Sequence, residues 1–406
     1  MPERPLEKVT IPLQGSARMI VHARPLWSRF VATSLYLVLL LAGPRGYCDV
    51  GADDVGRGSI PFGGVVPDIR EEESRLKFQD GDFVAVPIPI SNPTVGNGLV
   101  VGSAYFYPQT PEQEALQPAS LTGIAGMYTS NASRALVLAQ QNYWGGDRWR
   151  FTGAGGAMDV RLNLRTEDET SSGQRLDWQV KGAFLLARIL RRLSGDWYGG
   201  AYLRVIDAEQ RIDFGDDEEE ESRLAPGVYD RSAGIGLTAE YDSRDLPTNA
   251  YAGRYFKIEA LDNDTRYGST NDYRSGAVQF NSYHSLADDI VLAFDAQGCA
   301  RTGDVPLWDA CRIPLRGFAA FDYLGERSAS LQGEARWRMK GRWGLVAFAG
   351  GGTADAPEGV IEENVVPSYG VGLRFEVLPA KRINVRLDYA RFDGRDAVYF
   401  SVGEAF

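Results

Sequence analysis

Apolar and polar side chains alternate with a period of two through most of the chain after residue 83. One segment shows both faces, with an apolar face of Tyr369, Val371, Leu373, Phe375 and Val377 and an opposite face of Gly370, Gly372, Arg374 and Glu376. This period places successive side chains on opposite faces of a β-strand. The alternation recurs in residues 235–244, 331–339 and 383–389. Residues 184–193 also fit a helical period, but strands are predicted on both sides, so a strand is expected there as well.

The polar faces distinguish a membrane barrel from a soluble sandwich. A sandwich leaves its polar face to water and does not need clusters of opposite charges there. In this chain, charges of both signs share one face, as Glu334 and Arg336 do, which suits a hydrated, ion-paired lumen. Short connections such as residues 194–196 alternate with long polar ones such as residues 215–230. The pattern predicts an all-β fold, a transmembrane antiparallel β-barrel of about 16 strands over residues 83–406.

An apolar run near the N-terminus predicts export. Residues 30–41 follow basic residues, match the core of a signal peptide in length, and are short for a membrane span. We therefore predict a signal peptide over residues 1–48, with Met19 as the alternative start. An uncleaved anchor, or a lipid anchor on Cys48, is the competing interpretation. Residues 49–82, rich in glycine and charge, are predicted to be a periplasmic linker or tether.

Charge and histidine content exclude several functions. The net charge is −11, and no run rich in Lys and Arg offers a stripe for phosphates, which argues against nucleic acid as a partner. The only histidines are His22 and His284, which argues against a zinc site. The acidic run at residues 216–221 is expected to be a solvated loop, with binding of divalent cations as the alternative. No cofactor and no metal are expected.

Several short motifs resemble those of a known family. Leu315-Arg316-Gly317-Phe318 lies in a long loop between the predicted eleventh and twelfth strands, and Glu334-Ala-Arg336 follows in the twelfth. The other matching segments are residues 87–91, 96–98 and 240–245 and the aromatic strand that reaches Phe406. The chain resembles the bacterial surface antigen superfamily, which includes the BAM and TAM insertase barrels and the two-partner-secretion transporters. The resemblance covers residues 83–406.

The resemblance implies that the Leu315–Phe318 loop is a lid folded into the lumen. Arg316 would pair there with an acid on the barrel wall, because an unpaired buried guanidinium is costly. In the family this acid commonly comes from a Phe-x-Asp-x-Gly strand, but Gly350 stands at the Asp position here. Glu334 is therefore the predicted partner, with Arg336 beside it in the lumen; the alternatives are Glu376 and Asp388. Two roles are open for Arg316: an anchor for the loop, or a contact that breaks when the lid moves.

The resemblance also implies a function, with one departure. The family's insertases carry periplasmic POTRA domains, and residues 49–82 are too few to form one. We predict a short member that aids insertion or export of protein or lipid, with the cargo undetermined. The expected partners are outer-membrane lipids and lipopolysaccharide, the outer-membrane assembly machinery and a polypeptide or lipid cargo. The expected location is the outer membrane, and the expected state is a monomer.

Two other functions are compatible with a barrel. A passive porin-like channel would also carry charge in its lumen, but it would not require an Arg-Gly-Phe lid. A lipid-hydrolysing barrel would use a serine activated by histidine, and Ser282 or Ser285 lies near His284. No group that would orient this histidine is apparent in the sequence. We therefore predict that the chain is not an enzyme.

Two further sets of residues are candidates for structural roles. Cys299 and Cys311 are predicted to flank the tip of the lid loop and to pair, since exported proteins allow disulfides; free buried thiols are the alternative. The last predicted strand carries an apolar face that resembles an assembly signal, and its residues are Val398, Phe400, Val402 and Phe406.

Overall fold

The computed structural model describes residues 81–92, 95–165, 175–215, 227–247, 249–318, 323–355, 365–379, 382–392 and 395–406. The predicted signal peptide, nearly all of the predicted linker and the acidic run at 216–221 lie outside these ranges. No helix among the described residues has the length and apolarity needed to cross a membrane. The elements in chain order are β1 (Asp82–Asn92), β2 (Gly96–Phe106), α3 (Pro111–Leu116), β3 (Leu121–Thr129), β4 (Arg134–Trp144), β5 (Trp149–Arg165), β6 (Arg175–Ser194), β7 (Trp197–Gly215), β8 (Val228–Asp242), β9 (Gly253–Asn263), η1 (Thr265–Tyr267), β10 (Tyr273–Ala287), β11 (Ile290–Gly303), η2 (Leu307–Asp309), β12 (Cys311–Arg312), β13 (Leu324–Gly325), β14 (Arg327–Arg338), β15 (Trp343–Ala354), β16 (Val366–Leu378), β17 (Ile383–Phe392) and β18 (Arg395–Val402).

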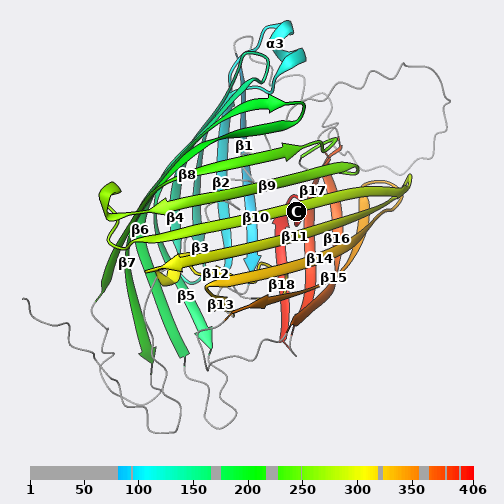
Figure 1. The fold of residues 1–406 in the computed structure, drawn as a ribbon. Helices are drawn as coiled ribbons and strands as arrows, with labels where there is room; N and C mark the ends of the chain where they lie inside the picture. The colour runs from blue at the N-terminus through cyan, green and yellow to red at the C-terminus, as the bar shows by residue number, and fades with distance from the viewer. Residues whose placement is uncertain are drawn as a thin grey trace, which may run out of the picture.

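Sixteen of the described strands close into one antiparallel barrel (Figure 1). The two remaining strands, β12 and β13, form a small separate sheet within the connection from β11 to β14. Residues 184–193 belong to β6, which pairs with β5 on one side and β7 on the other. These ladders satisfy the backbone on both edges, so they override the local helical period. The predicted all-β barrel is confirmed.

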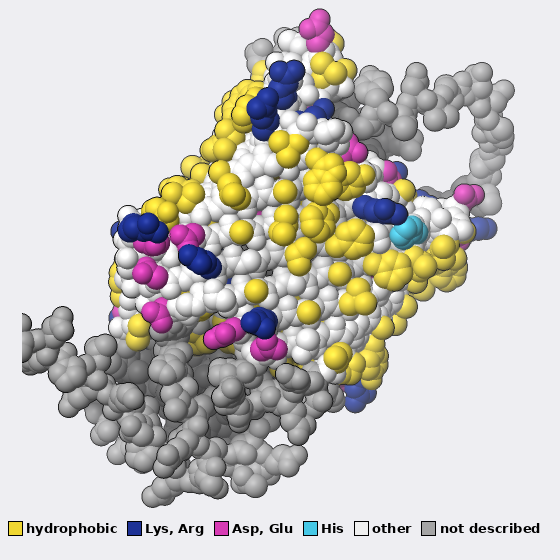
Figure 2. Space-filling model, in the orientation of Figure 1, with side chains coloured by type: hydrophobic (Ala, Val, Ile, Leu, Met, Phe, Trp, Pro, Cys, Tyr) yellow, Lys and Arg dark blue, Asp and Glu magenta, His cyan; other side chains and the backbone are white. Residues whose placement is uncertain are grey.

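The outer wall carries an apolar belt. Large apolar side chains in the middle of strands are exposed, among them Leu138, Leu237 and Leu331, and Figure 2 shows apolar side chains over much of the visible wall. Five tryptophans stand, partly exposed, at strand ends beside short turns: Trp144, Trp149, Trp197, Trp337 and Trp343. An apolar belt with aromatic side chains at its edge is the outer surface of a membrane barrel. Because such barrels have short periplasmic turns, the end that carries these tryptophans is the periplasmic end.

A charge in the middle of this belt should destabilise the barrel. Leu237 lies near the centre of β8 and is 71% exposed. Replacing it with Arg should lower the free energy of unfolding by about 2–4 kcal/mol. Tyr229 lies at the start of the same strand, and Tyr229→Arg should lower this free energy by only about 0–1 kcal/mol. Urea unfolding of both variants in lipid vesicles measures the difference. Equal losses would mean that the centre of β8 does not face lipid.

The barrel closes through a short contact between β1 and β18, which we call the seam. The pairing of β1 with β18 consists of one residue pair in the described strands, Ser91 with Phe400, whereas β1 and β2 pair over eleven residues. Pro87 and Pro89 have no N–H group. Because pairing with β2 is unbroken around them, the missing donors fall on the edge of β1 that faces β18. The seam is therefore a weakly bonded place in an otherwise continuous wall.

Candidate functional site

The connection from β11 to β14 folds into the barrel and forms a lid. Its residues Leu315 and Phe318 are buried, and Phe318 stacks on Phe392 of β17 with a ring-centroid distance of 3.8 Å. Gly317 between them has φ +102°, and an added Cβ would lie 3.0 Å from the Cβ of Phe392. A residue with a side chain would be strained in that conformation and crowded in that space. The Arg-Gly-Phe sequence thus allows the sharp turn that directs Arg316 into the lumen.

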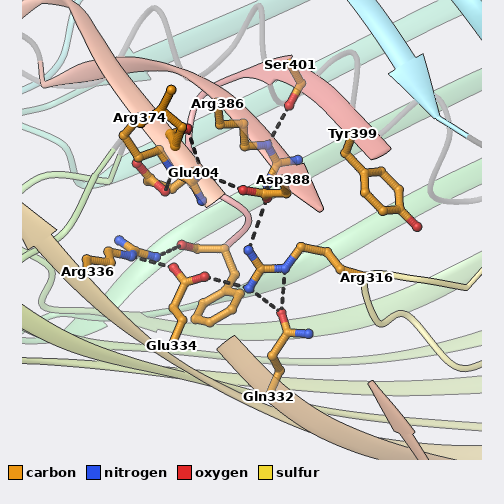
Figure 3. Close-up of polar contacts among 12 residues, drawn as sticks. Arg316, Gln332, Glu334, Arg336, Arg374, Arg386, Asp388, Tyr399, Ser401 and Glu404 are labelled. Carbon is orange, nitrogen blue, oxygen red and sulfur yellow. Dashed lines mark hydrogen bonds and ion pairs between the residues drawn. The ribbon is translucent and has the colours of Figure 1, made fainter. Parts of the chain in front are cut away.

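Arg316 contacts three polar side chains of the wall (Figure 3). One terminal nitrogen donates to Glu334 at 2.6 Å and to Gln332 at 2.8 Å, and the other donates to Asp388 at 3.1 Å. The guanidinium also lies over the ring of Phe348, 3.5 Å from its centroid. Charge-assisted hydrogen bonds and a cation–π contact together offset the cost of burying this charge. The predicted partner Glu334 and the alternative Asp388 thus both bind Arg316.

The acids that hold Arg316 are themselves held by arginines of the wall. Arg336 donates to Glu334 at 2.5 Å, and Arg374 donates to Asp388 at 2.5 Å. Arg374 also binds Glu404 at 2.8 Å. These contacts form a continuous chain of opposite charges from the lid to the segment after β18 (Figure 3). We call this chain the lumen network.

The acid position of the family motif is filled differently in this chain. Gly350 pairs with Gln332 across β14 and β15, and an added Cβ on Gly350 would lie 3.1 Å from the Cβ of Gln332. Gln332 therefore lies beside the position of the missing Asp and offers its side-chain oxygen to Arg316. Glu376, the third predicted partner, faces inward on β16, but the ion pairs of Arg316 in the described chain are with Glu334 and Asp388.

A second charged anchor holds the lid, and the sequence analysis missed it. Asp309 of η2 accepts a hydrogen bond from Arg204 of β7 at 3.0 Å, and Arg301 of β11 lies 3.4 Å away. All three side chains are buried. Burial alone would raise the pKa of Asp309, but the positive charges of Arg204 and Arg301 lower that pKa below the usual value for aspartate. Asp309 is therefore charged throughout the neutral range, and protonation at low pH would weaken this anchor.

The residue before Asp309 adds an apolar anchor. Trp308 is fully buried and belongs to a cluster of inward-facing apolar side chains from β4 to β7, including Met158, Trp178 and Phe184. The size of Trp308 is a sequence signal that could have indicated this contact, because so large an apolar side chain is seldom left in water.

A disulfide attaches the lid covalently. Cys299 and Cys311 are bonded, with their Cα atoms 5.6 Å apart. Cys299 lies on β11 and not in the loop as predicted, because β11 stays paired with β10 as far as Gly303. The bond therefore joins the lid to the wall. Together with Trp308, Asp309 and Arg316, it attaches the lid to the wall at several separate points.

The end of the last strand differs from the prediction. Val398, Phe400 and Val402 lie on β18, but the strand ends at Val402. Gly403 has φ +91°, a left-handed conformation that turns the chain away from the wall. Phe406 therefore does not share a strand face with the other three residues. It packs instead against Ala250, Tyr283 and Ala293.

The serine and histidine considered for hydrolysis lie on the outer face of β10. Ser282 pairs with Phe294 across β10 and β11, and His284 pairs with Leu292. The ring centroids of His284 and Phe294 lie 6.4 Å apart. Ser285 instead donates to the backbone oxygen of Tyr251. Hydrogen bonds of the described residues join neither serine to His284.

Comparison with known proteins identifies the fold. Neither protein-family models nor curated proteins match the sequence. BamA from Haemophilus ducreyi lacking POTRA domains 1–3 superposes with a TM-score of 0.53 at 13% identity, over 79% of this chain and 70% of that structure. The chain has the barrel fold of that BamA. CdiB from Acinetobacter baumannii is also similar in fold to this chain, with a TM-score of 0.51 at 10% identity, over 80% of this chain and 60% of CdiB. At these identities the likeness establishes the fold and not the activity.

Proposed function

We propose that this outer-membrane barrel aids the insertion or export of a polypeptide or lipid through the seam. The observation that carries the proposal is the single residue pair between β1 and β18. A barrel is normally more stable when it closes completely, because an unpaired strand edge leaves backbone N–H and C=O groups without hydrogen-bond partners. A seam left weak by Pro87 and Pro89 can part at low cost and present the edge of β1 to a cargo.

The lumen network supports this proposal. Arg316 joins the lid to β14 and β17, and β17 is the neighbour of the seam strand β18. A shift of β18 should therefore be transmitted to the lid through β17 alone. In this proposal the barrel acts as a monomer among outer-membrane lipids and lipopolysaccharide, the assembly machinery supplies its cargo, and it catalyses no covalent reaction.

Locking the seam tests this function. A deletion strain should lose one class of outer-membrane proteins or lipids, and the wild-type gene should restore it. Ser91→Cys with Phe400→Cys should form a bond across the seam, because these residues are direct partners, and should abolish the rescue. Ala85→Cys with Ser103→Cys bonds β1 to β2, which stay paired, and should rescue normally.

Two results would contradict the proposal. Full rescue of the deletion strain by the variant with Ser91→Cys and Phe400→Cys would exclude passage of cargo through the seam. An unchanged profile in the deletion strain, together with defects in solute uptake, would favour the alternative of a passive porin-like channel. The charged lumen fits that alternative, which also predicts a steady large conductance for the intact protein in planar bilayers.

A further inference from the structure

The turn between β14 and β15 carries three cations at the periplasmic edge of the apolar belt. Residues 337–343 read Trp-Arg-Met-Lys-Gly-Arg-Trp, so Arg338, Lys340 and Arg342 lie between two tryptophans. All three cations are exposed. Gly341 has φ +79°, and an added Cβ there would meet no atom within 4 Å. The tip of the turn therefore stands clear of the barrel and presents its charges to the surroundings.

The barrel supplies no carboxylate to neutralise these cations. At the extracellular edge, by contrast, exposed arginines pair with neighbouring acids, and these pairs are Arg134–Asp159, Arg211–Glu209, Arg231–Asp207, Arg266–Asp264 and Arg274–Asp262. Within the described ranges, Arg338, Lys340 and Arg342 have no such ion pair. The turn is thus a concentrated positive charge whose counter-charge must come from outside the chain.

The two tryptophans place the turn at the level of lipid head groups. The indole N–H of Trp337 donates to Asp289 of the β10–β11 turn at 3.0 Å, and the ring of Trp343 lies 4.8 Å from that of Phe375 on β16. Both tryptophans are partly exposed on the outer wall. Aromatic side chains of membrane barrels gather at the interface between the acyl chains and water. The cations one step further toward the periplasm therefore lie where lipid phosphates lie.

Below the tryptophans, β14 and β15 turn small side chains toward the lipid. One row of paired residues across four strands reads Leu292, Ala335, Ala347 and Val371, and the next row reads Phe294, Gly333, Ala349 and Tyr369. In both rows the residues of β14 and β15 are small and their neighbours on β11 and β16 are large. We call these four small residues the shallow strip. It leads from the tryptophans toward the middle of the belt, and one acyl chain can pack along it.

We propose that the β14–β15 turn binds an anionic phospholipid of the periplasmic leaflet. Lys340 and Arg342 donate to the phosphate oxygens, the glycerol region lies beside the two tryptophans, and one acyl chain covers the shallow strip. A phospholipid supplies these three chemistries in the same order as the wall, and charge-assisted hydrogen bonds to phosphate are strong. Cations next to an anionic lipid surface are attracted to it, which favours a head group with a net negative charge.

Arg338 has a supporting position in this site. Its guanidinium donates to the main-chain oxygen of Asp288 and lies over the ring of Tyr251, 4.1 Å from the centroid. These contacts hold Arg338 in place, so that it adds positive charge at a fixed point beside Lys340 and Arg342. The site lies on the outer wall, and β15 is the third strand from β18. It therefore does not depend on opening of the seam or on the proposed function.

Lipid titration of the purified full-length protein in detergent micelles tests the proposal, with bound lipids counted by native mass spectrometry. Wild-type protein should bind the first phosphatidylglycerol about thirtyfold more tightly than phosphatidylcholine, which corresponds to about 2 kcal/mol for two cations. The variant with Lys340→Gln and Arg342→Gln should bind the two lipids equally. Ala347→Trp fills the shallow strip and should weaken the binding of both lipids.

A matched variant controls for overall charge. Arg211→Gln with Arg274→Gln removes the same charge at the extracellular edge and should keep the preference for phosphatidylglycerol. A mobility shift on heating in gels checks that each variant is folded. An intact preference after loss of Lys340 and Arg342, or an equal loss in the control, would overturn the site. Displacement of the lipid by inorganic phosphate would show a site for free phosphate instead. These assays use no cargo, so their failure leaves the deletion-strain result standing.

Discussion

Glu334→Ala should release the lid and strongly destabilise the barrel. The carboxylate of Glu334 is shared by Arg316 and Arg336, and its side chain is fully buried. Its removal leaves two guanidinium groups that have lost a partner. Breaking a buried pair costs about 3–5 kcal/mol, and the polar groups that remain around Arg316 should keep this loss near the lower end.

Arg316→Ala should be milder, because Glu334 and Asp388 keep Arg336 and Arg374 as partners. Both variants should expose the lid to proteases, and the double variant should be no worse than Glu334→Ala alone, since the residues act as a pair. Urea unfolding and limited proteolysis measure these effects. Glu376→Ala is the matched control, an inward-facing acid on the neighbouring wall. Additive losses, or an equal loss in the control, would show that Glu334 is not the acid on which the lid depends.

Trp308→Ala should produce the second large effect. The side chain is fully buried among apolar residues of β4 to β7, so its removal leaves a cavity between the lid and the wall. Such truncations cost about 3–5 kcal/mol. The loss should appear in urea unfolding and as faster proteolysis of the lid, although Arg316 and the disulfide remain in place.

A tryptophan on the outer surface provides the comparison. Trp337→Ala removes the same side chain from the membrane edge, where Trp337 is 47% exposed and donates to Asp289. Its effect on stability should be much smaller, because little packed volume is lost. If the two variants were equally destabilised, the lid would not be packed against the wall as the cluster around Trp308 indicates.

The contacts that hold the lid differ in the sequence separation between their two partners. Cys311 joins a residue twelve positions away, Arg316 pairs with Asp388 across 72 positions, and Asp309 pairs with Arg204 across 105. A lid attached in this way to β7, β11, β14 and β17 is a fixed plug while its contacts hold. This arrangement makes the seam, which has fewer bonds, the part expected to move first.

The sequence by itself determined which side of each strand faces lipid, because alternation with period two is a steric property of the extended backbone. It therefore placed Arg374 inside and Val371 outside, and the lid motif with the missing Asp pointed to Glu334. Only the tertiary structure decided that Asp388 shares Arg316 with Glu334, that Asp309 meets Arg204, and that Phe406 leaves the last strand. These contacts cross the lumen between distant strands. They depend on the order and register of the closed barrel, which no local pattern of residues contains.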